Sequence, residues 1–422
     1  MARVGEGGGT VLVLGAGVAG LSVALNLRRA GRDVAVLDPA EPGSGASSGN
    51  SGLISASAVA PLSMPGMLRQ VPRWLLDPLG PLAIRPAYLP RAVPYLLRWA
   101  RAGRPERVLA VSDGLRALHA ASHDEWARLL GTEGAEGFIR RTGQVLGFEG
   151  PPLPGAGALD AMLRERHGIA AEPLDRAAME RMFPGIAPGV TRGLLLPENG
   201  HSLDPGRMVG VLADRLRAEG GAIRAERVRA IRPRDGGWQV STEAGEHAAA
   251  VVVVALGARS NALLAPLGRR LPMEAERGYH AMLPEPSAAL PRPISFRHRG
   301  LALTPMAGGL RASGTVEFAG VEAPPDMRRA EGLVRQAAQV FPDLRHGAPR
   351  FWMGARPGLP DSLPALGAAG MPGLFLCTGH GHFGLTSGPP SGRLVAEMIL
   401  GVPPFLDAGA YDPGRFGTFR RG

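Results

Sequence analysis

Three glycines near the N-terminus have the spacing of a phosphate-binding turn. Gly15, Gly17 and Gly20 form the pattern G-x-G-x-x-G, with Val18 and Ala19 between the last two. In such a turn the first glycine permits a tight bend and the second lets a pyrophosphate approach the backbone, while the third allows a helix to pack against a strand. The diphosphate would lie at the positive end of the following helix. The predicted chemistry is dinucleotide binding, and a purely structural turn is the alternative.

The elements that must position these glycines form a β-α-β unit. Residues 11–14 are a short aliphatic run, as expected for a strand buried on both faces. Residues 21–30 carry helix formers, and a second apolar strand over 33–38 ends in Asp38, whose carboxylate can accept from ribose hydroxyls. The unit predicts a nucleotide site but does not by itself separate FAD from NAD.

A loop of small residues follows the second strand. Residues 43–54 read GSGASSGNSGLI and leave many backbone amides open. This loop is predicted to bind phosphate and to pass beside a flat ring, and a flexible surface loop is the alternative. The candidate contacts in it are Ser47, Ser48, Asn50, Gly52, Leu53 and Ile54.

Two later regions are expected to complete the same sheet. Residues 220–233 and 247–260 read as strands joined by a hairpin-like segment over 235–246, and 373–399 read as a strand, a glycine loop and a helix. Gly379, Gly381 and Gly384 repeat the glycine spacing, but no second strand with a terminal acid follows, so no second dinucleotide site is predicted. The candidate cofactor contacts in these regions are Val228, Ala255, Gly257, Gly379, Gly381, His382, Phe383, Gly384 and Leu385.

The composition excludes several chemistries. The sequence contains no lysine, which rules out a lysine Schiff base and a P-loop. Cys377 is the only cysteine, so an intramolecular disulfide and a multi-cysteine metal site are excluded, and a reducing compartment is favoured. His380 and His382 lack a nearby carboxylate in the sequence, so no metal is predicted. The sequence contains no run of 18 uninterrupted apolar residues, so no membrane-spanning helix is predicted.

Basic and aromatic residues alternate over residues 67–107. This segment has eight arginines against two acids, Asp77 and Glu106, and includes Trp74 and Trp99. The composition is typical of a segment that lies at a membrane interface. A proline-broken lid packed on the rest of the protein is the alternative. The net charge of +10 indicates attraction to anions without naming one.

The order of these motifs resembles a known family. The chain is similar to the FAD-dependent D-amino acid oxidase superfamily, and within it to the D-amino acid dehydrogenase branch. The resemblance covers nearly the whole chain and rests on these stretches: VLVLGAGVAGLS with Asp38, SSGNSGLI, PLAIRP, GHSLDPGRMV, VVVALGA, ERGYH, GARPGLPDSLPALG and GHGHFGLTSGPPSG.

The resemblance implies an α/β fold with two interleaved domains. A Rossmann-like FAD-binding domain of the glutathione-reductase type would comprise residues 1–62, 200–270 and 351–422. An α+β substrate domain with an antiparallel sheet would comprise 63–199 and 271–350. Proteins of this family transfer hydride from an amino acid Cα to flavin N5, giving an imino acid that water hydrolyses to a keto acid and ammonia. No acid–base residue is required if the amine arrives unprotonated.

The resemblance also implies roles for four residues. Arg356 matches the position that binds the substrate carboxylate in related flavoproteins, with a structural ion pair as its alternative role. Tyr279 and His280 lie where the chain re-enters the substrate domain, so each would contact substrate or serve in the core. His380 lies in the loop that passes beside the isoalloxazine and would contact flavin or substrate.

The expected activity is D-amino acid oxidation with electrons passed to quinone or another carrier, because the lysine that some related oxidases place near the flavin is missing. D-proline or cis-4-hydroxy-D-proline oxidation and a glycine or sarcosine oxidase are alternatives in the same class. A tRNA-modifying flavoprotein and a non-catalytic FAD-binding protein are alternatives of other classes, although no RNA-binding module is present. The expected location is cytoplasmic, with peripheral contact to the inner face of the membrane through residues 67–107.

Overall fold

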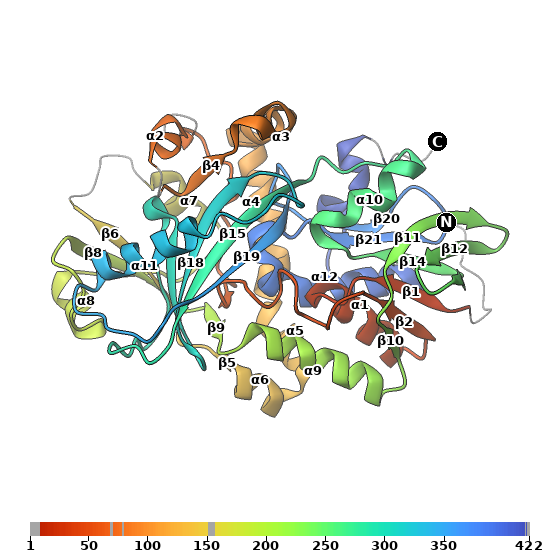
Figure 1. Cartoon of the computed structure of the whole chain (residues 1–422), viewed down its shortest axis with the longest axis horizontal. Helices are drawn as coiled ribbons and strands as arrows, with labels where there is room; N and C mark the ends of the chain where they lie inside the picture. The colour runs from red at the N-terminus through yellow and green to blue at the C-terminus, as the bar shows by residue number, and fades with distance from the viewer. Residues whose placement is uncertain (1–8, 68–70, 78–79, 151–156, 418, 420–422) are drawn as a thin grey trace.

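The computed structural model describes residues 9–67, 71–77, 80–150, 157–417 and 419 (Figure 1). Within these residues, six strands form one sheet toward one end of the molecule. Neighbouring strands are parallel except for the last pair. The order is β10 (Ala222–Arg224), β2 (Val34–Leu37), β1 (Val11–Leu14), β14 (Val251–Val254), β21 (Leu374–Thr378) and β20 (Ala365–Ala368).

Both faces of this sheet are covered. Val11 and Val13 of β1 pack in the core on the helical face, whereas Leu12 and Leu14 pack in the core on the opposite face. Strands buried on both sides need apolar side chains at every position, which explains the uninterrupted aliphatic runs.

Helices cover the first face of the sheet. A Cβ added to Gly392 would lie 2.3 Å from the Cβ of Ser22, so glycine lets the last helix approach the first closely. The helices that contribute to this core are α1 (Val18–Arg29), α4 (Pro105–Ala120), α5 (Ser122–Leu130), α6 (Thr132–Phe138), α9 (Pro205–Ala218) and α12 (Gly384–Leu400).

A small antiparallel sheet and the short helix α10 (Ser260–Leu264) cover the second face. Its strands are β11 (Val228–Arg234), β12 (Gly237–Thr242) and β13 (Glu246–Ala249). The strands expected over 220–233 and 247–260 are therefore each divided between two sheets, and the expected connection over 235–246 contains β12. Short breaks before β11 and at Ala250 let the chain step from one sheet to the other, which apolar periodicity alone does not reveal.

A larger, mostly antiparallel sheet forms the other half of the molecule. Among the described residues it has nine strands, and one face packs on α8 (Arg176–Met182) and α11 (Arg328–Val340). The order is β19 (Arg350–Gly358), β15 (Glu274–Leu283), β18 (Gly309–Phe318), β17 (Leu301–Met306), β16 (Ile294–Phe296), β6 (Gln144–Glu149), β8 (Val190–Leu196) and β7 (Glu172–Leu174), with β4 (Leu82–Ile84) paired beside β18.

Further short elements complete the larger half and link it to the smaller one. A three-stranded sheet joins β3 (Leu53–Ile54), β9 (Gly200–Ser202) and β5 (Ile139–Arg140), and α7 (Ala158–Arg166) lies near the edge of the large sheet. Helices α2 (Val71–Leu76) and α3 (Leu89–Ala102) lie at the top of the view in Figure 1, beside β4.

The architecture has the predicted fold class, with a Rossmann-like sheet interleaved with a mostly antiparallel one. Two segments lie outside the half expected for them. β19, within 351–422, is a strand of the large sheet, and α4 and α5, within 63–199, pack on the helical face of the Rossmann-like sheet. The expected division into two domains stays a prediction. In the part of the chain described, no helix has the length and apolarity needed to cross a bilayer.

Candidate active site

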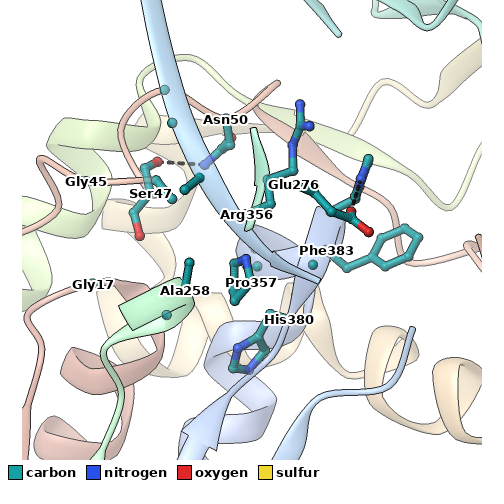
Figure 2. Close-up of a pocket in the computed structure, with 18 of the residues that line it drawn as sticks. Gly17, Gly45, Ser47, Asn50, Ala258, Glu276, Arg356, Pro357, His380 and Phe383 are labelled. Carbon is teal, nitrogen blue, oxygen red and sulfur yellow. Dashed lines mark hydrogen bonds and ion pairs between the residues drawn. The ribbon is translucent and has the colours of Figure 1, made fainter. Parts of the chain in front are cut away.

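A cavity of about 1230 Å³ lies between the two large sheets. One side is formed by the β1–α1 turn, the loop after β2, the end of β14 and the loop before α12. The other side is formed by residues of β15, β18 and β19 in the large sheet, among them Glu276 and Arg356, which Figure 2 labels. The cavity therefore spans the interface between the halves, where ligand sites commonly occur.

The β1–α1 turn is tightly packed. A Cβ on Gly20 would lie 2.0 Å from the carbonyl oxygen of Gly15, so the helix start requires glycine there. The Ala16 N–H donates to Asp38 Oδ2 at 2.8 Å, and the Val18 N–H donates to Ser47 Oγ at 3.1 Å. The turn, the acid after β2 and the small-residue loop are thus one hydrogen-bonded unit at the cavity wall.

The loop over 43–54 is held by specific contacts. Within it, Asn50 Nδ2 donates to the carbonyl of Ser47 at 2.6 Å, which Figure 2 shows as a dashed line. From β18, Arg311 Nη1 donates to the carbonyls of Ser48 at 3.1 Å and Asn50 at 2.7 Å. Burial lowers the pKa of Arg311 to about 10, so the guanidinium is charged at neutral pH. These bonds tie the loop to the opposite half of the molecule.

Most of the residues expected to bind cofactor line this cavity. They are Gly15, Gly17, Val18, Ala19, Asp38, Ser47, Asn50, Leu53, Val228, Ala255, Gly257, Gly381, His382, Phe383, Gly384 and Leu385. Those that do not line it are Gly20, Ser48, Gly52, Ile54 and Gly379. Gly20 and Ser48 support the wall from behind, because Gly20 packs against Gly15 and the carbonyl of Ser48 accepts a hydrogen bond from Arg311.

Arg356, on β19, lines the cavity and is half-buried. Its Nη1 donates to the carbonyl of Thr315 at 3.0 Å. Thr315 has φ +57°, an unusual conformation for a β-branched residue, which turns its carbonyl toward the arginine. Burial lowers the pKa of Arg356, and the nearby Glu276 carboxylate opposes that effect. A charged guanidinium in a sheltered cavity is suited to bind a carboxylate.

Glu276 lies directly beside Arg356, because β15 and β19 pair these two residues in register. It is only 4% exposed. Tyr95 of α3 donates to its Oε1 at 2.6 Å, and Oε2 lies 2.8 Å from Nε2 of His382. Burial tends to raise the pKa of Glu276, but the hydrogen bond from His382 and the charges nearby lower it overall. Glu276 was not predicted from the sequence, although it begins the quoted stretch ERGYH; nothing in that stretch indicates its partners.

Two helices fix the loop that carries His380 and His382. Trp126 of α5 donates to the carbonyl of Leu385 at 2.9 Å. His119 of α4 packs on the ring of Phe383, with 4.8 Å between ring centroids. Helices from the segment 63–199 thereby set the position of the C-terminal loop at the cavity.

His380 lines the cavity with a buried ring. Among the described residues, its Nε2 has no hydrogen-bond partner. Burial lowers its pKa to about 4, so the ring is neutral at physiological pH. An unpartnered buried nitrogen at the wall is the position from which a bound ligand accepts or donates a hydrogen bond.

Tyr279 and His280 are placed differently from each other. Tyr279 reaches the cavity wall, but its hydroxyl donates to Glu317 and accepts from the Asp326 N–H within the core of the large sheet. His280 does not line the cavity; its Nδ1 bonds the carbonyl of Gly49 at 2.9 Å, and its ring stacks on Trp352. His280 was expected either to contact substrate or to serve in the core, and its bond to Gly49 helps to hold the loop over 43–54.

An apolar arm of the cavity extends from Glu276 toward α3. The ring centroids of Tyr95 and Phe318 are 5.7 Å apart, and Phe318 is the partner of Glu276 across β15 and β18. Arg356 and Glu276 therefore lie where the polar part of the cavity meets this arm. The apolar side chains that line it are Leu82, Ile84, Leu96, Trp99, Val316 and Phe318.

No group of three or more histidine, cysteine, aspartate or glutamate side chains able to bind a metal occurs in the described ranges.

The class of protein follows from comparison of this fold and site with known proteins. Residues 10–398 match the family model described as FAD dependent oxidoreductase, so the chain belongs to this family of FAD-dependent oxidoreductases. The D-amino-acid oxidase of Bradyrhizobium diazoefficiens is 36% identical over 426 residues, which cover 96% of this chain and 98% of that protein. The D-amino acid dehydrogenase of Rhizorhabdus wittichii is 32% identical over 411 residues, covering 94% and 98%.

Solved structures support the fold. Glycine oxidase from Geobacillus kaustophilus superposes with a TM-score of 0.74 at 22% identity, covering 96% of this chain and 98% of that one. L-Proline dehydrogenase from P. horikoshii superposes with a TM-score of 0.72 at 17% identity, covering 98% and 99%. At these identities the likeness concerns the fold.

The residues present fit the FAD that the family binds. The glycine turn leaves the cavity wall free of side chains at Gly17, where an added Cβ meets only Ser47 Oγ at 3.4 Å. The ring of His380 also lines the cavity, and its Nε2 has no hydrogen-bond partner among the described residues. A cavity lined both by a phosphate-type glycine turn and by a neutral polar ring suits a dinucleotide with a flat aromatic head.

Proposed function

We propose that this protein is a dehydrogenase that oxidises D-amino acids with FAD, giving imino acids that hydrolyse to keto acids and ammonia. The observation that carries the proposal is the half-buried Arg356 at a cavity that also contains the dinucleotide-binding turn. Two relatives that match nearly their full length and are named for D-amino acid oxidation support it.

The proposal assigns the cavity residues to two tasks. Gly17, Val18 and Ser47 would hold the pyrophosphate, Asp38 a ribose and Val228 the adenine, while the loop over 380–385 would hold the isoalloxazine. Bound FAD supplies the two-electron acceptor. Arg356 would bind the substrate carboxylate and fix the Cα in one orientation, because a forked guanidinium gives two parallel hydrogen bonds.

The apolar arm next to Arg356 favours a particular class of D-amino acid. A carboxylate bound at Arg356 leaves the substrate side chain beside Phe318, Trp99 and their neighbours. Burying one apolar side chain there contributes roughly 1.5–3 kcal/mol, whereas a second carboxylate would lose its hydration. Bulky apolar D-amino acids are therefore the proposed substrates, ahead of D-aspartate and D-glutamate.

Anaerobic bleaching of the flavin absorbance near 450 nm tests this function. D-Phenylalanine and D-leucine are expected to bleach the flavin rapidly, while their L-enantiomers and D-aspartate are at least about 10²-fold slower. The panel includes glycine, sarcosine, D-proline and cis-4-hydroxy-D-proline, since fastest bleaching by one of these would assign the alternative substrate. Bleaching by none of them would contradict the proposed function.

Electrons are proposed to pass to a quinone or another carrier. The relatives carry both oxidase and dehydrogenase in their names, so the family leaves the acceptor open. To identify the acceptor, the rate of turnover with a soluble quinone in the absence of oxygen is compared with the rate of oxygen consumption without quinone. Turnover equally fast with oxygen alone would make the protein an oxidase.

The segment over 67–107 is proposed to contact the inner face of the cytoplasmic membrane. Leu89, Val93 and Leu97 recur every fourth residue of α3 and are 45%, 40% and 54% exposed; Leu76 of α2 is 84% exposed. The exposed arginines around them include Arg91 and Arg98. Apolar side chains among arginines suit an anionic lipid surface. Residues 68–70 and 78–79, with Arg69 among them, lie outside the described residues.

Flotation with vesicles containing anionic lipid checks this contact. The wild type is expected to float with the vesicles, and a Leu76→Ser, Leu97→Ser variant to lose at least about tenfold in partitioning, because two exposed leucines no longer enter the lipid. Met162→Ser is the matched control, since Met162 lies on α7, outside residues 67–107, and is 40% exposed. Wild-type protein that stays at the bottom of the gradient would dismiss the membrane contact.

A further inference from the structure

The carboxylate of Glu276 and the partly exposed imidazole of His382 form a pair at the cavity that FAD binding alone does not require. They come from β15 and from the loop before α12, more than 100 residues apart in the chain. His382 Nε2 lies 2.8 Å from Glu276 Oε2, and both residues line the cavity. Figure 2 shows Glu276 beside Arg356. The side chain of His382 keeps 28% of its surface exposed, whereas that of Glu276 keeps 5%.

The hydrogen-bond pattern fixes the tautomer of His382. The pKa of Glu276 is lowered overall, so its carboxylate is ionised and can only accept. Oε1 accepts from Tyr95, whose pKa burial raises, and Oε2 must accept from His382. The proton of a neutral His382 ring therefore sits on Nε2, and Nδ1 carries a lone pair. Among the described residues, no donor bonds to Nδ1.

His382 is neutral at physiological pH. Burial lowers its pKa first, the Arg356 guanidinium from β19 lowers it further, and Glu276 from β15 partly opposes them. The other titratable groups nearby are Tyr95 from α3 and His380 of the same loop. The ring is thus an unprotonated base whose conjugate acid would be stabilised by an adjacent carboxylate.

We infer that His382, positioned by Glu276, accepts the proton that the substrate ammonium must lose before its Cα–H can be transferred. A free amino acid arrives as a carboxylate with an ammonium group. With its carboxylate on Arg356, the ammonium lies on the side of the cavity where Glu276 and His382 face it. One N–H bond of the ammonium breaks and one N–H bond forms at Nδ1 of His382, leaving a neutral amine and an imidazolium paired with Glu276. No electrons are gained or lost in this step.

This inference rests on the proposed oxidation of amino acids and adds a group that binds the amine. Glu276 acts as a positioning residue, because it holds the ring and its tautomer through Nε2. Tyr95 links the pair to α3, so the helix that lines the apolar arm also helps to position the base. The carboxylate of Glu276 accepts hydrogen bonds from both Tyr95 and His382, which explains why this buried residue of β15 can stay charged.

The pH profile of kcat/KM for His382→Asn tests the inference. Without the base the enzyme must select the small fraction of neutral amine, so kcat/KM is expected to fall by about 10²-fold at pH 7 and to recover to within about threefold of the wild type near pH 10. Glu276→Gln removes the charge that raises the pKa of His382, so the acid limb of its profile is expected to move to lower pH. An equal loss for His382→Asn at every pH would overturn the inference.

A binding measurement gives a readout that does not depend on turnover. The α-methyl analogue of the best substrate has no Cα hydrogen and is followed by its effect on the flavin spectrum. The wild type is expected to bind it equally well from pH 7 to pH 9, because the proton stays in the complex. The affinity of His382→Asn for the analogue is expected to rise about tenfold for each unit of increasing pH, since only the neutral amine fits. Equal pH dependence in both proteins would also overturn the inference.

The control is His247→Asn, which breaks another imidazole–carboxylate pair. His247 on β13 lies 2.6 Å from Glu226 and does not line the cavity, so its variant is expected to keep the wild-type profile. The FAD content of each purified variant shows whether it has folded and bound the cofactor. If His382→Asn loses FAD, the inference is decided by whether the acid limb of the pH profile moves to lower pH in Glu276→Gln. Failure of the wild type to oxidise any amino acid would contradict the proposed function instead.

Discussion

Replacing Arg356 by methionine is expected to lower kcat/KM for D-amino acids by about 10²–10⁴-fold. Methionine retains most of the buried volume but offers no donor to a carboxylate. Removing one partner of a buried charged contact costs roughly 3–5 kcal/mol, because the other charge is left unpaired. Arg356→Lys keeps the charge but not the forked guanidinium, so its kcat/KM is expected to lie between those of the wild type and Arg356→Met. The loss is expected mainly in KM, since the contact exists already in the bound substrate.

Two measurements make the Arg356 result specific. Benzoate, a carboxylate that cannot be oxidised, should lose affinity in parallel with substrate, while the FAD content stays at the wild-type level. Arg350→Met, at the exposed start of the same strand β19, is the matched control and should stay within about twofold of the wild type. If benzoate bound equally well to Arg356→Met and wild type, the carboxylate would be held elsewhere and the arginine would be a structural residue.

Gly20→Ala is expected to weaken FAD binding. The added Cβ would lie 2.0 Å from the carbonyl oxygen of Gly15 and 3.2 Å from the Cβ of Ala255. Both neighbours belong to strand ends at the cavity, so neither can move like the tip of a flexible side chain. Helix α1 would have to shift away from β1, carrying the backbone of Gly17 and Val18 with it. Overpacking of this kind costs roughly 1–3 kcal/mol and occasionally more.

The ratio of flavin to protein absorbance after purification, together with Tm, measures this effect. At least about a tenfold weaker FAD affinity is expected, because each 1.4 kcal/mol is a factor of ten. Gly210→Ala in α9 is the matched control: nothing lies within 4 Å of its added Cβ, and a helical glycine-to-alanine change stabilises by about 0.5–1 kcal/mol. Full FAD content in Gly20→Ala would show that the turn tolerates a wider opening than its packing indicates.

The local elements around the nucleotide turn could be predicted from sequence. The aliphatic run of β1, the glycines of the turn and the acid after β2 lie within 28 residues, and strand and helix formation depend on neighbours at that range. The family that these motifs resemble is the family to which the chain belongs. The small-residue loop over 43–54 was located in the same way, because open backbone amides are a property of its own composition.

Boundaries that depend on sheet pairing were less predictable. The run over 220–233 is apolar enough for one strand, yet β10 pairs with β2 while β11 pairs with β12. Similarly, β19 follows from its pairing with β15 rather than from its own residues. Which partner a strand takes is decided by the whole sheet, and two short strands have the same apolar pattern as one long strand.

The sequence by itself determined the β-α-β unit and the class of cofactor site, and its family resemblance singled out Arg356 as the candidate for binding a carboxylate. Only the tertiary structure brought Glu276, His382 and Tyr95 together, and only it placed His280 behind the cavity wall, against Gly49. The physical reason is the separation along the sequence of the residues that determine each feature. Backbone conformation and burial follow local patterns of residue type, whereas contact between side chains more than 100 residues apart depends on strand register and helix packing, which no local pattern encodes.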